Sequence, residues 1–261
     1  MKTTVVDSFG LKIISSQRLF LQFLEMTFLT VIGLFRPPFR IKELFQQINF
    51  IGNGSLIIIS FCVSFAAMVT IYEASFHMKM VIQNDSMVPG FASLLILREL
   101  GAVVTALLLT SRVGAGYTAE VGTMQTTEQI DALKMLGIDP IHYLVGPRLI
   151  ASILSTVMLV AIANVVCILG ATFVSQYSLG FTQEMFFTSM RRFVVFKDYY
   201  LSLIKGAFFG AVIPLVSCFF GFKCVPGAEG VGRATTQSVV ISSISIIFLD
   251  FVLSYIFSYF Y

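Results

Sequence analysis

Residues 149–174 read LIASILSTVMLVAIANVVCILGATFV, which is 26 positions without a charged side chain. A helix that crosses the hydrocarbon core of a bilayer, about 30 Å thick, needs roughly 20 predominantly apolar residues. Four other stretches meet the same requirement. They are Ile51–Tyr72, Val88–Thr110, Leu201–Phe222 and Val239–Tyr261. The sequence therefore predicts an all-α integral membrane protein with five transmembrane helices.

Composition supports this class and argues against several others. Hydrophobic residues make up 57% of the chain and charged residues 12%, which is about half the charged share of a soluble domain. The net charge of +3 is too small to indicate a nucleic-acid partner. The four cysteines form no C-x-x-C pair and mostly lie in apolar runs, so we expect neither disulfides nor a metal site.

The N-terminal segment, residues 1–48, contains a sixth apolar run at Leu19–Phe35. This run includes Gln22 and Glu25 and is followed by RPPFR, whose prolines end a helix. We interpret it as an amphipathic helix lying at the membrane interface, with a sixth span as the alternative. Residues 49–261 would then form the transmembrane bundle of a single domain.

Lysine and arginine placement predicts the orientation. With five spans, the N-terminal segment, the connection between the second and third spans and the connection between the fourth and fifth lie on one side. These segments carry eleven Lys and Arg residues, and the opposite loops carry four. Because positive residues concentrate in cytoplasmic loops, we expect a cytoplasmic N-terminus and an outward C-terminus.

A short polar stretch, GTMQTTEQIDALKMLGIDP at 122–140, interrupts the apolar pattern on the predicted cytoplasmic side. Thr126 followed by Gln129 fits a capping box, and Gly137 can close the helix in the left-handed conformation. A helix of about ten residues is too short to be stable alone, so it must dock. It rests on its own bundle, or it is a coupling helix that enters a groove on a separate ATPase. Its apolar stripe comprises Ile130, Leu133, Leu136 and Ile138.

Nothing in the sequence indicates that the chain is an enzyme. A P-loop requires G-x-x-x-x-G-K-[ST], and the glycine-rich GAEGVGR at 227–233 lacks the Lys-Ser/Thr pair. His77 and His142 are isolated from each other and from any cysteine pair, and no G-x-S-x-G occurs. We expect no cofactor in this chain; if the stretch at 122–140 is a coupling helix, ATP and Mg²⁺ are held by the partner ATPase that hydrolyses the nucleotide.

Four ionisable residues fall within the predicted spans: Arg98, Glu99, Lys205 and Asp250. Each costs about 2.5–3.5 kcal/mol at the centre of a membrane helix, so unpaired burial is unfavourable. One possible arrangement pairs Lys205 with Glu99 and Arg98 with Asp250. These charges either form interhelical salt bridges that fix the bundle or line a path for cargo; if that cargo is a lipid, the path lets a cation meet its phosphate headgroup.

An acyl chain requires an apolar wall more than particular hydrogen bonds. The outward end of the first span offers Ile71, Tyr72 and Phe76 for such a wall. The alternative is that these side chains pack against neighbouring helices or bulk lipid.

Two long motifs resemble one known family. The run LRELGAVVTALLLTSRVGAGYTAEVGTMQTTEQIDALKMLGIDPIHYLVGPRLIA at 97–151, and GAEGVGRATTQSVVISS with LDFVLS further on, are similar to the MlaE/YrbE permeases. These are the membrane subunits of Mce-associated lipid ABC transporters. Ala102 departs from the family pattern, since many relatives have proline after RELG.

The resemblance implies a homodimeric permease with a cytoplasmic ABC ATPase, an Mce-domain protein on the outer side and phospholipid cargo. It places the chain in a bacterial inner membrane, with a plastid inner envelope as a possible variant. The family motif includes Arg98 and Glu99, which favours them as functional residues. A non-transporting scaffold that anchors a cytoplasmic partner is the alternative function. The ATPase-coupling residues implied by the resemblance are Glu120, Thr123, Thr127, Glu128, Asp131 and Lys134.

Overall fold

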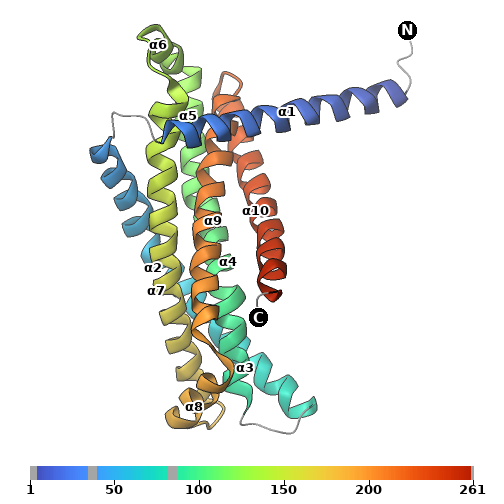
Figure 1. Cartoon of the computed structure of the whole chain (residues 1–261), viewed down its shortest axis with the longest axis vertical. Helices are drawn as coiled ribbons and strands as arrows, with labels where there is room; N and C mark the ends of the chain where they lie inside the picture. The colour runs from blue at the N-terminus through green and yellow to red at the C-terminus, as the bar shows by residue number, and fades with distance from the viewer. Residues whose placement is uncertain (1–4, 35–39, 82–86, 260–261) are drawn as a thin grey trace.

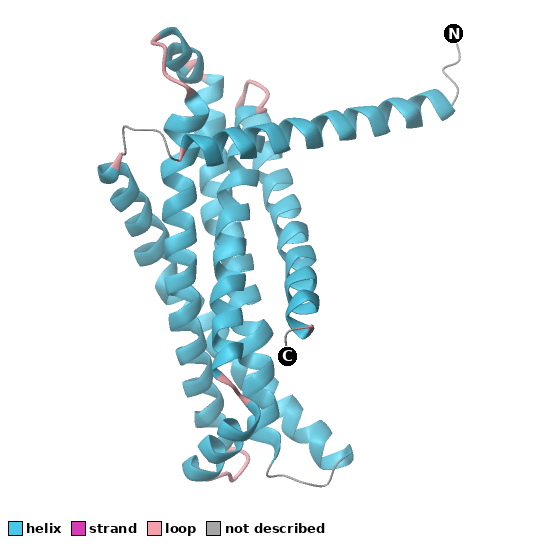
Figure 2. Cartoon of the chain, in the orientation of Figure 1, coloured by secondary structure: helices cyan, strands magenta, loops and turns pink. Residues whose placement is uncertain are grey.

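A computed structural model of the chain describes residues 5–34, 40–81 and 87–259. The described residues form helices and short connections without a strand (Figure 2). Five helices of the described part are long and apolar enough to cross a membrane, which confirms the predicted number of spans. They are Ile41–Met78, Val88–Thr126, Ile141–Tyr177, Phe196–Phe222 and Ala228–Ser258. The protein is therefore a multi-pass membrane protein.

The first, fourth and fifth spans are continuous helices, whereas the second and third contain wider π-helical turns. The continuous helices are α2 (Ile41–Val81), α9 (Phe196–Phe222) and α10 (Ala228–Ser258). The second span is built from α3 (Val88–Leu95), η2 (Ile96–Leu100), α4 (Gly101–Leu109), η3 (Thr110–Gly114) and α5 (Ala115–Thr126). The third comprises η4 (Ile141–Val145) and α7 (Gly146–Tyr177). Single π-turns of this kind occur frequently at functional sites.

The second span extends well beyond the predicted end at Thr110 and reaches Thr126. Most of the residues from 111 to 126 are small or polar, so hydropathy alone underestimates the length of the helix. Their small size instead permits close packing against α9 and α10. A Cβ atom added at Gly114, for example, would lie 3.1 Å from the hydroxyl oxygen of Ser217 in α9. The helix therefore continues because it is packed against neighbouring helices.

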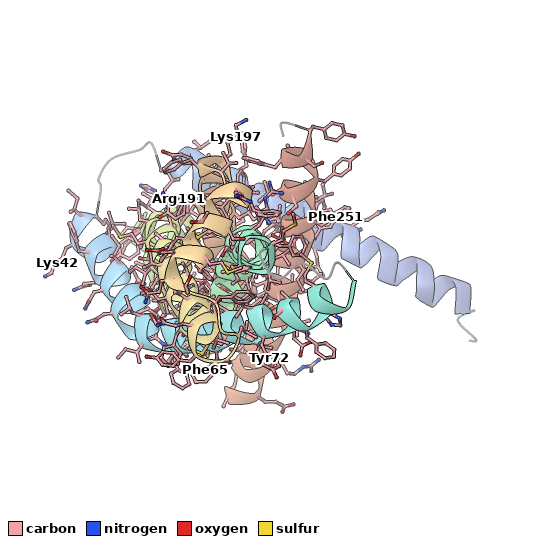
Figure 3. All side chains as sticks on the ribbon, turned by 90° about the horizontal axis from the view of Figure 1, so that it is seen from below. Lys42, Phe65, Tyr72, Arg191, Lys197 and Phe251 are labelled. Carbon is pink, nitrogen blue, oxygen red and sulfur yellow. The ribbon has the colours of Figure 1, made fainter. Side chains whose placement is uncertain are left out.

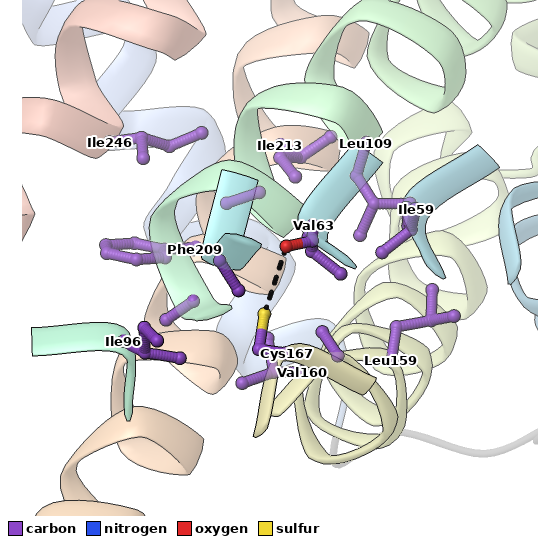
Figure 4. Close-up of a cluster of buried hydrophobic side chains, with 14 of the residues drawn as sticks. Ile59, Val63, Ile96, Leu109, Leu159, Val160, Cys167, Phe209, Ile213 and Ile246 are labelled. Carbon is purple, nitrogen blue, oxygen red and sulfur yellow. Dashed lines mark hydrogen bonds between the residues drawn. The ribbon is translucent and has the colours of Figure 1, made fainter. Parts of the chain in front are cut away.

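The core lies where α2, α7 and α9 pack around the second span. Its centre is a cluster of aliphatic side chains with Phe209, and the Cys167 thiol donates a hydrogen bond to the Val63 carbonyl at 3.4 Å (Figure 4). Helices α7 and α9 approach closely, since a Cβ added at Gly210 would lie 2.9 Å from the carbonyl oxygen of Ser152. This tight packing fixes the positions of the charged side chains between the helices.

Helix α1 (Val5–Gly33) crosses one end of the bundle instead of running parallel to the spans (Figure 1). It begins well before the predicted start at Leu19, and it is not among the candidate spans of the described chain. Phe23 packs edge-on against Phe219 with ring centroids 5.4 Å apart, and Lys223 of the α9–α10 connection donates a hydrogen bond to Gln22. Partial burial lowers the pKa of the Lys223 ammonium. The crosswise placement is consistent with an interfacial helix, which stays a prediction.

The two ends of the bundle carry different elements (Figure 1). Helix α6 (Gln129–Met135), helix α1 and the connection between α9 and α10 lie at one end, called here the α6 end. Helix α8 (Gln183–Phe193) and the start of α3 lie at the other. This grouping is the one that a five-span topology requires. The assignment of the α6 end to the cytoplasm stays a prediction.

Candidate functional site: a buried charge cluster and the α6 end

Lys205 of α9 is the centre of a charged cluster inside the bundle. Its side chain is fully buried, and its Nζ lies 2.9 Å from Glu99 Oε2 and 2.7 Å from Asp250 Oδ1. The ammonium also donates a hydrogen bond to the Arg98 carbonyl oxygen at 2.9 Å. The predicted pairing of Lys205 with Glu99 is confirmed, and Asp250 joins the same cation.

Arg98 is paired differently from the prediction. Its Nε lies 2.6 Å from Oδ1 of Asp198, a fully buried carboxylate in the first turn of α9. The other carboxylate oxygen, Asp198 Oδ2, accepts a hydrogen bond from the Val195 amide at 2.8 Å. The predicted pairing of Arg98 with Asp250 is wrong, because α10 brings Asp250 to Lys205. We missed Asp198 because the span was expected to start at Leu201, although a carboxylate in the first turn of a helix is a common capping signal.

A polar layer next to the cluster holds the second span against α7 and α9. Asn164 of α7 donates a hydrogen bond from Nδ2 to Ser202 Oγ at 2.9 Å. Its Oδ1 faces Gly101 so closely that a Cβ there would lie 1.9 Å from it. Any larger residue at position 101 would have to displace this amide oxygen. Gly101 directly follows η2, the π-turn that carries Arg98 and Glu99, so the layer fixes the position of both charges.

The cluster is open to the molecular surface on its acidic side. The Glu99 side chain is 43% exposed, whereas Lys205 is completely enclosed. Ser254 of α10 donates a hydrogen bond to Glu99 Oε1 at 3.2 Å. A polar group that approaches from outside therefore meets Glu99 and the partly exposed Arg98 first. Such an arrangement provides charged hydrogen-bonding groups at the molecular surface.

The predicted apolar wall is divided between the core and the surface. Ile71 is completely buried in the hydrophobic core, so the structure contradicts its assignment to a lipid-facing wall. Its position on α2 faces α7 and the second span, which explains the burial. Tyr72 and Phe76 are exposed, and Figure 3 shows Tyr72 at the edge of the molecule. These two side chains remain available to lipid.

Helix α6 differs from the predicted helix at its start. It spans seven residues from Gln129, and Glu128 before it adopts a left-handed conformation with φ 59°. The predicted capping box is wrong, because α5 continues through Thr126, whose hydroxyl donates a hydrogen bond to the Thr123 carbonyl at 3.0 Å. The end of the helix is as predicted. Gly137 has φ 74°, and its amide donates a hydrogen bond to the Lys134 carbonyl at 2.9 Å.

The apolar residues of α6 do not form a single docked stripe. Ile130 is buried and Leu133 packs beside it against the apolar cluster around Val121. Met135 and Leu136 instead project away, 90% and 74% exposed. Helix α6 is therefore attached to its own bundle by one face and presents two large apolar side chains on another.

The remaining predicted coupling residues lie around α6, but Glu120 also turns towards the bundle. Its Oε1 lies 2.9 Å from Nη2 of Arg148, a cation of α7 that is only 5% exposed. The guanidinium lies 5.4 Å from the Tyr117 ring centroid and donates to the Leu144 carbonyl at 3.1 Å. Sequence reasoning misses this role because Arg148 directly precedes the predicted span start at Leu149 and therefore counts as a loop charge. Thr123, Thr127, Glu128, Asp131 and Lys134 are exposed, and Lys134 pairs with Asp131 at 2.8 Å.

Comparisons with known proteins agree with this architecture. The family model described as Permease MlaE matches residues 44–256. A probable ABC transporter permease protein of Rickettsia felis is 34% identical over 98% of this chain and 99% of its own length. A probable ABC transporter permease protein of Synechocystis sp. is 34% identical over 82% of this chain and 81% of its own length.

A plant protein is also similar over part of the chain. The chloroplastic protein TRIGALACTOSYLDIACYLGLYCEROL 1 of Arabidopsis thaliana is 39% identical over 63% of this chain and 47% of its own length. The matched family region contains α2 from Leu44 onwards, α6, the second, third and fourth candidate spans, and the fifth span as far as Ile256. The chain is a membrane permease and belongs to the MlaE permease family.

Proposed function

We propose that the chain is the membrane subunit of an ABC transporter that moves phospholipid between a membrane and an Mce-domain protein on its outer side. A separate cytoplasmic ATPase binds ATP and Mg²⁺ and supplies the work. The membrane is a bacterial inner membrane, with a plastid inner envelope as the alternative. The observation that carries the proposal is the exposure of Met135 and Leu136 on a short helix at the α6 end.

Helix α6 has the properties that a coupling element requires. One face is attached to the bundle through Ile130, so a displacement of α6 is expected to move α5, the helix it contacts. The opposite side offers large apolar side chains beside the exposed charges of Asp131 and Lys134. An apolar centre with a polar rim is the usual composition of a protein interface. We infer that this side enters a groove on the ATPase.

The lipid path is proposed to lie between two copies of the chain. An ATPase dimer presents two grooves, and each chain supplies one α6, so a twofold assembly satisfies both. Helix α10 contributes Asp250 and Ser254 to the charge cluster while its outer side exposes large apolar residues such as Phe251 (Figure 3). A path along this side would bring a lipid headgroup to Glu99 and Arg98.

The experiment tests α6 with the double substitution Met135→Ser, Leu136→Ser. Because both side chains are exposed, the bundle should fold normally, whereas co-purification of the ATPase should fall at least tenfold. Phospholipid transfer to the Mce-domain partner should be lost with it. The matched control is Phe196→Ser, which removes an equally exposed apolar side chain near the α8 end.

Two results would contradict the proposal. Unchanged ATPase binding in the double variant would show that α6 is not the coupling helix. The second result concerns the parent protein. If it binds the ATPase and supports turnover normally, but bound and transferred phospholipid do not change with nucleotide, the scaffold function is favoured instead.

A further inference from the structure

A cavity of about 400 Å³ lies at the α6 end, away from the charge cluster. Its walls come from the end of α1, the first turns of α2, the residues that follow α6 and the first turns of η4 and α7. Leu34, Ile41, Leu44 and Ile150 make much of this lining apolar. The volume falls within the usual range of small-molecule sites, about 300–1,000 Å³.

The cavity lies at the level where two spans begin. The candidate spans that start at Ile41 and at Ile141 both contribute their first residues to its wall. Helix α1 crosses the bundle at the same level (Figure 1). An apolar cavity at the boundary between hydrocarbon and headgroups suits an amphiphile, whose tail enters the cavity while its polar head remains at the surface.

Arg40 is the cation at the rim of the cavity. Its Nη2 donates a hydrogen bond to the Tyr143 hydroxyl at 2.8 Å and lies 2.8 Å from Glu43 Oε1. The guanidinium also lies 3.7 Å from the centre of the Tyr143 ring. Among the described residues, both polar contacts use Nη2, which leaves the Nε and Nη1 donors to meet a phosphate. The Tyr143 ring holds the guanidinium in place for that contact.

Asp139 supplies a negative charge to the same lining. Its Oδ1 accepts a hydrogen bond from the Ile141 amide at 3.0 Å, so the carboxylate is held by the backbone at the start of η4. The other oxygen can accept from an ammonium group. The lining carries one arginine, which is already paired with Glu43, and one carboxylate, Asp139, so it does not favour a purely anionic head. It matches a head that carries both a phosphate and an ammonium.

We propose that this cavity binds one zwitterionic phospholipid with a primary ammonium head, such as phosphatidylethanolamine, from the leaflet at the α6 end. The phosphate contacts Arg40, the ammonium contacts Asp139 and one acyl chain fills the apolar cavity. The lipid stays bound as a structural component between α1, α2 and the residues after α6. This inference does not rest on the proposed transport cycle, because the site is separate from the charge cluster.

Lipid retention in the full chain tests the proposal. The protein is equilibrated in nanodiscs with equal phosphatidylethanolamine, phosphatidylglycerol and phosphatidylcholine, then released and analysed by native mass spectrometry. The parent chain should retain one phosphatidylethanolamine in preference to the other two lipids. The double variant Arg40→Gln, Asp139→Asn should reduce that retained fraction at least tenfold. The matched control is Lys42→Gln on α2, whose side chain projects away from the bundle (Figure 3).

A variant with a filled cavity tests the binding of the acyl chain separately from the binding of the headgroup. A Cβ at Gly146 would lie 3.9 Å from both His142 Nδ1 and Leu34 Cδ2, so a side chain can be added there. Gly146→Leu should abolish lipid retention with the rim intact, and Ile150→Phe serves as a second variant if the first does not fold.

Several results would overturn the inference. Equal retention of phosphatidylglycerol would exclude a zwitterionic site. Unchanged retention in the folded cavity-filling variant would show that no acyl chain enters. A free phosphate ion offers Arg40 the same oxygen atoms as a phospholipid headgroup, so inorganic phosphate is the second probe. Arg40-dependent binding of inorganic phosphate alone, equal in strength in the parent chain and in Gly146→Leu, would identify a phosphate site instead of a lipid site.

Discussion

Two buried cations, Lys205 in the charge cluster and Arg148 at the α6 end, are neutralised by different sets of partners. Lys205 contacts two carboxylates, Glu99 and Asp250, and one carbonyl. Arg148 contacts a single carboxylate, Glu120, together with one carbonyl and the Tyr117 ring. Both are almost completely enclosed, so burial alone does not explain the difference.

The position along the span accounts for the difference. Lys205 lies in α9 next to a π-turn within the second span, where the surroundings are hydrocarbon and helices. Arg148 lies in the first turn of α7, near the start of its span, and its partner Glu120 is 53% exposed at the end of the bundle. Water can hydrate the outer part of Glu120, whereas Lys205 depends on protein groups. The comparison therefore predicts unequal costs when each cation is removed.

Removing the Lys205 charge should have the largest effect. Lys205→Met leaves Asp250, only 19% exposed, without its cation inside the bundle, and breaking a buried pair costs about 3–5 kcal/mol, whereas Glu99 can meet water on its exposed side. We expect a low yield of folded protein in the membrane fraction and a strongly reduced melting temperature in detergent. Lys134→Met is the matched control, because its pair with Asp131 is exposed and such pairs contribute about 0.3–0.5 kcal/mol.

A second substitution shows whether charge is the cause of that loss. Adding Asp250→Asn to Lys205→Met removes one of the uncompensated carboxylates and should restore part of the stability. If Lys205→Met melted like the parent protein, the cluster would not hold the bundle together, and its pairing would have to be explained by function alone.

Removing the Arg148 charge should have an intermediate effect. Arg148→Met leaves Glu120 able to meet water, so we expect a loss of roughly 1.5–3 kcal/mol, the range for hydrogen bonds to charged groups. Thermal unfolding of Arg148→Met, Glu120→Gln and the double variant forms a cycle that isolates their coupling. A loss larger than that of Lys205→Met would reverse the comparison between the two sites.

Hydropathy predicted the spans but not all of their limits. Leu149–Val174 lies within a helix that the structure extends to Ile141–Tyr177, since an uncharged apolar run of that length has few alternatives. Hydropathy ends the predicted second span too early, at Thr110, because the glycines, alanines and polar residues that follow lower the mean hydropathy. These residues contribute contacts with α9 and α10, and the sequence does not show which helices pack side by side.

Pairing in the charge cluster was predictable only in part. Charge balance indicated that Lys205 and Glu99 need partners, but the partner of Arg98 depends on how far α9 extends at its start. Once α9 begins at Phe196, Asp198 lies in its first turn beside Arg98. The Arg148–Glu120 pair was missed for a related reason. Arg148 directly precedes the predicted start of the third span at Leu149, so hydropathy places it in the connection, whereas α7 includes it.

The smallest expected effect tests the backbone at the α6 end. Glu128 adopts φ 59°, a left-handed conformation that costs a non-glycine residue about 1–2 kcal/mol. Glu128→Gly removes that strain, but it also increases the freedom of the unfolded chain, so we expect a net gain of at most about 1 kcal/mol. Gln129→Gly, one position later inside α6, should instead destabilise, because its backbone is helical. Melting temperatures of the two variants measure the difference. A loss for Glu128→Gly comparable to that for Gln129→Gly would show that the Glu128 side chain stabilises α6, and that the α6 end depends on charge as the cluster around Lys205 does.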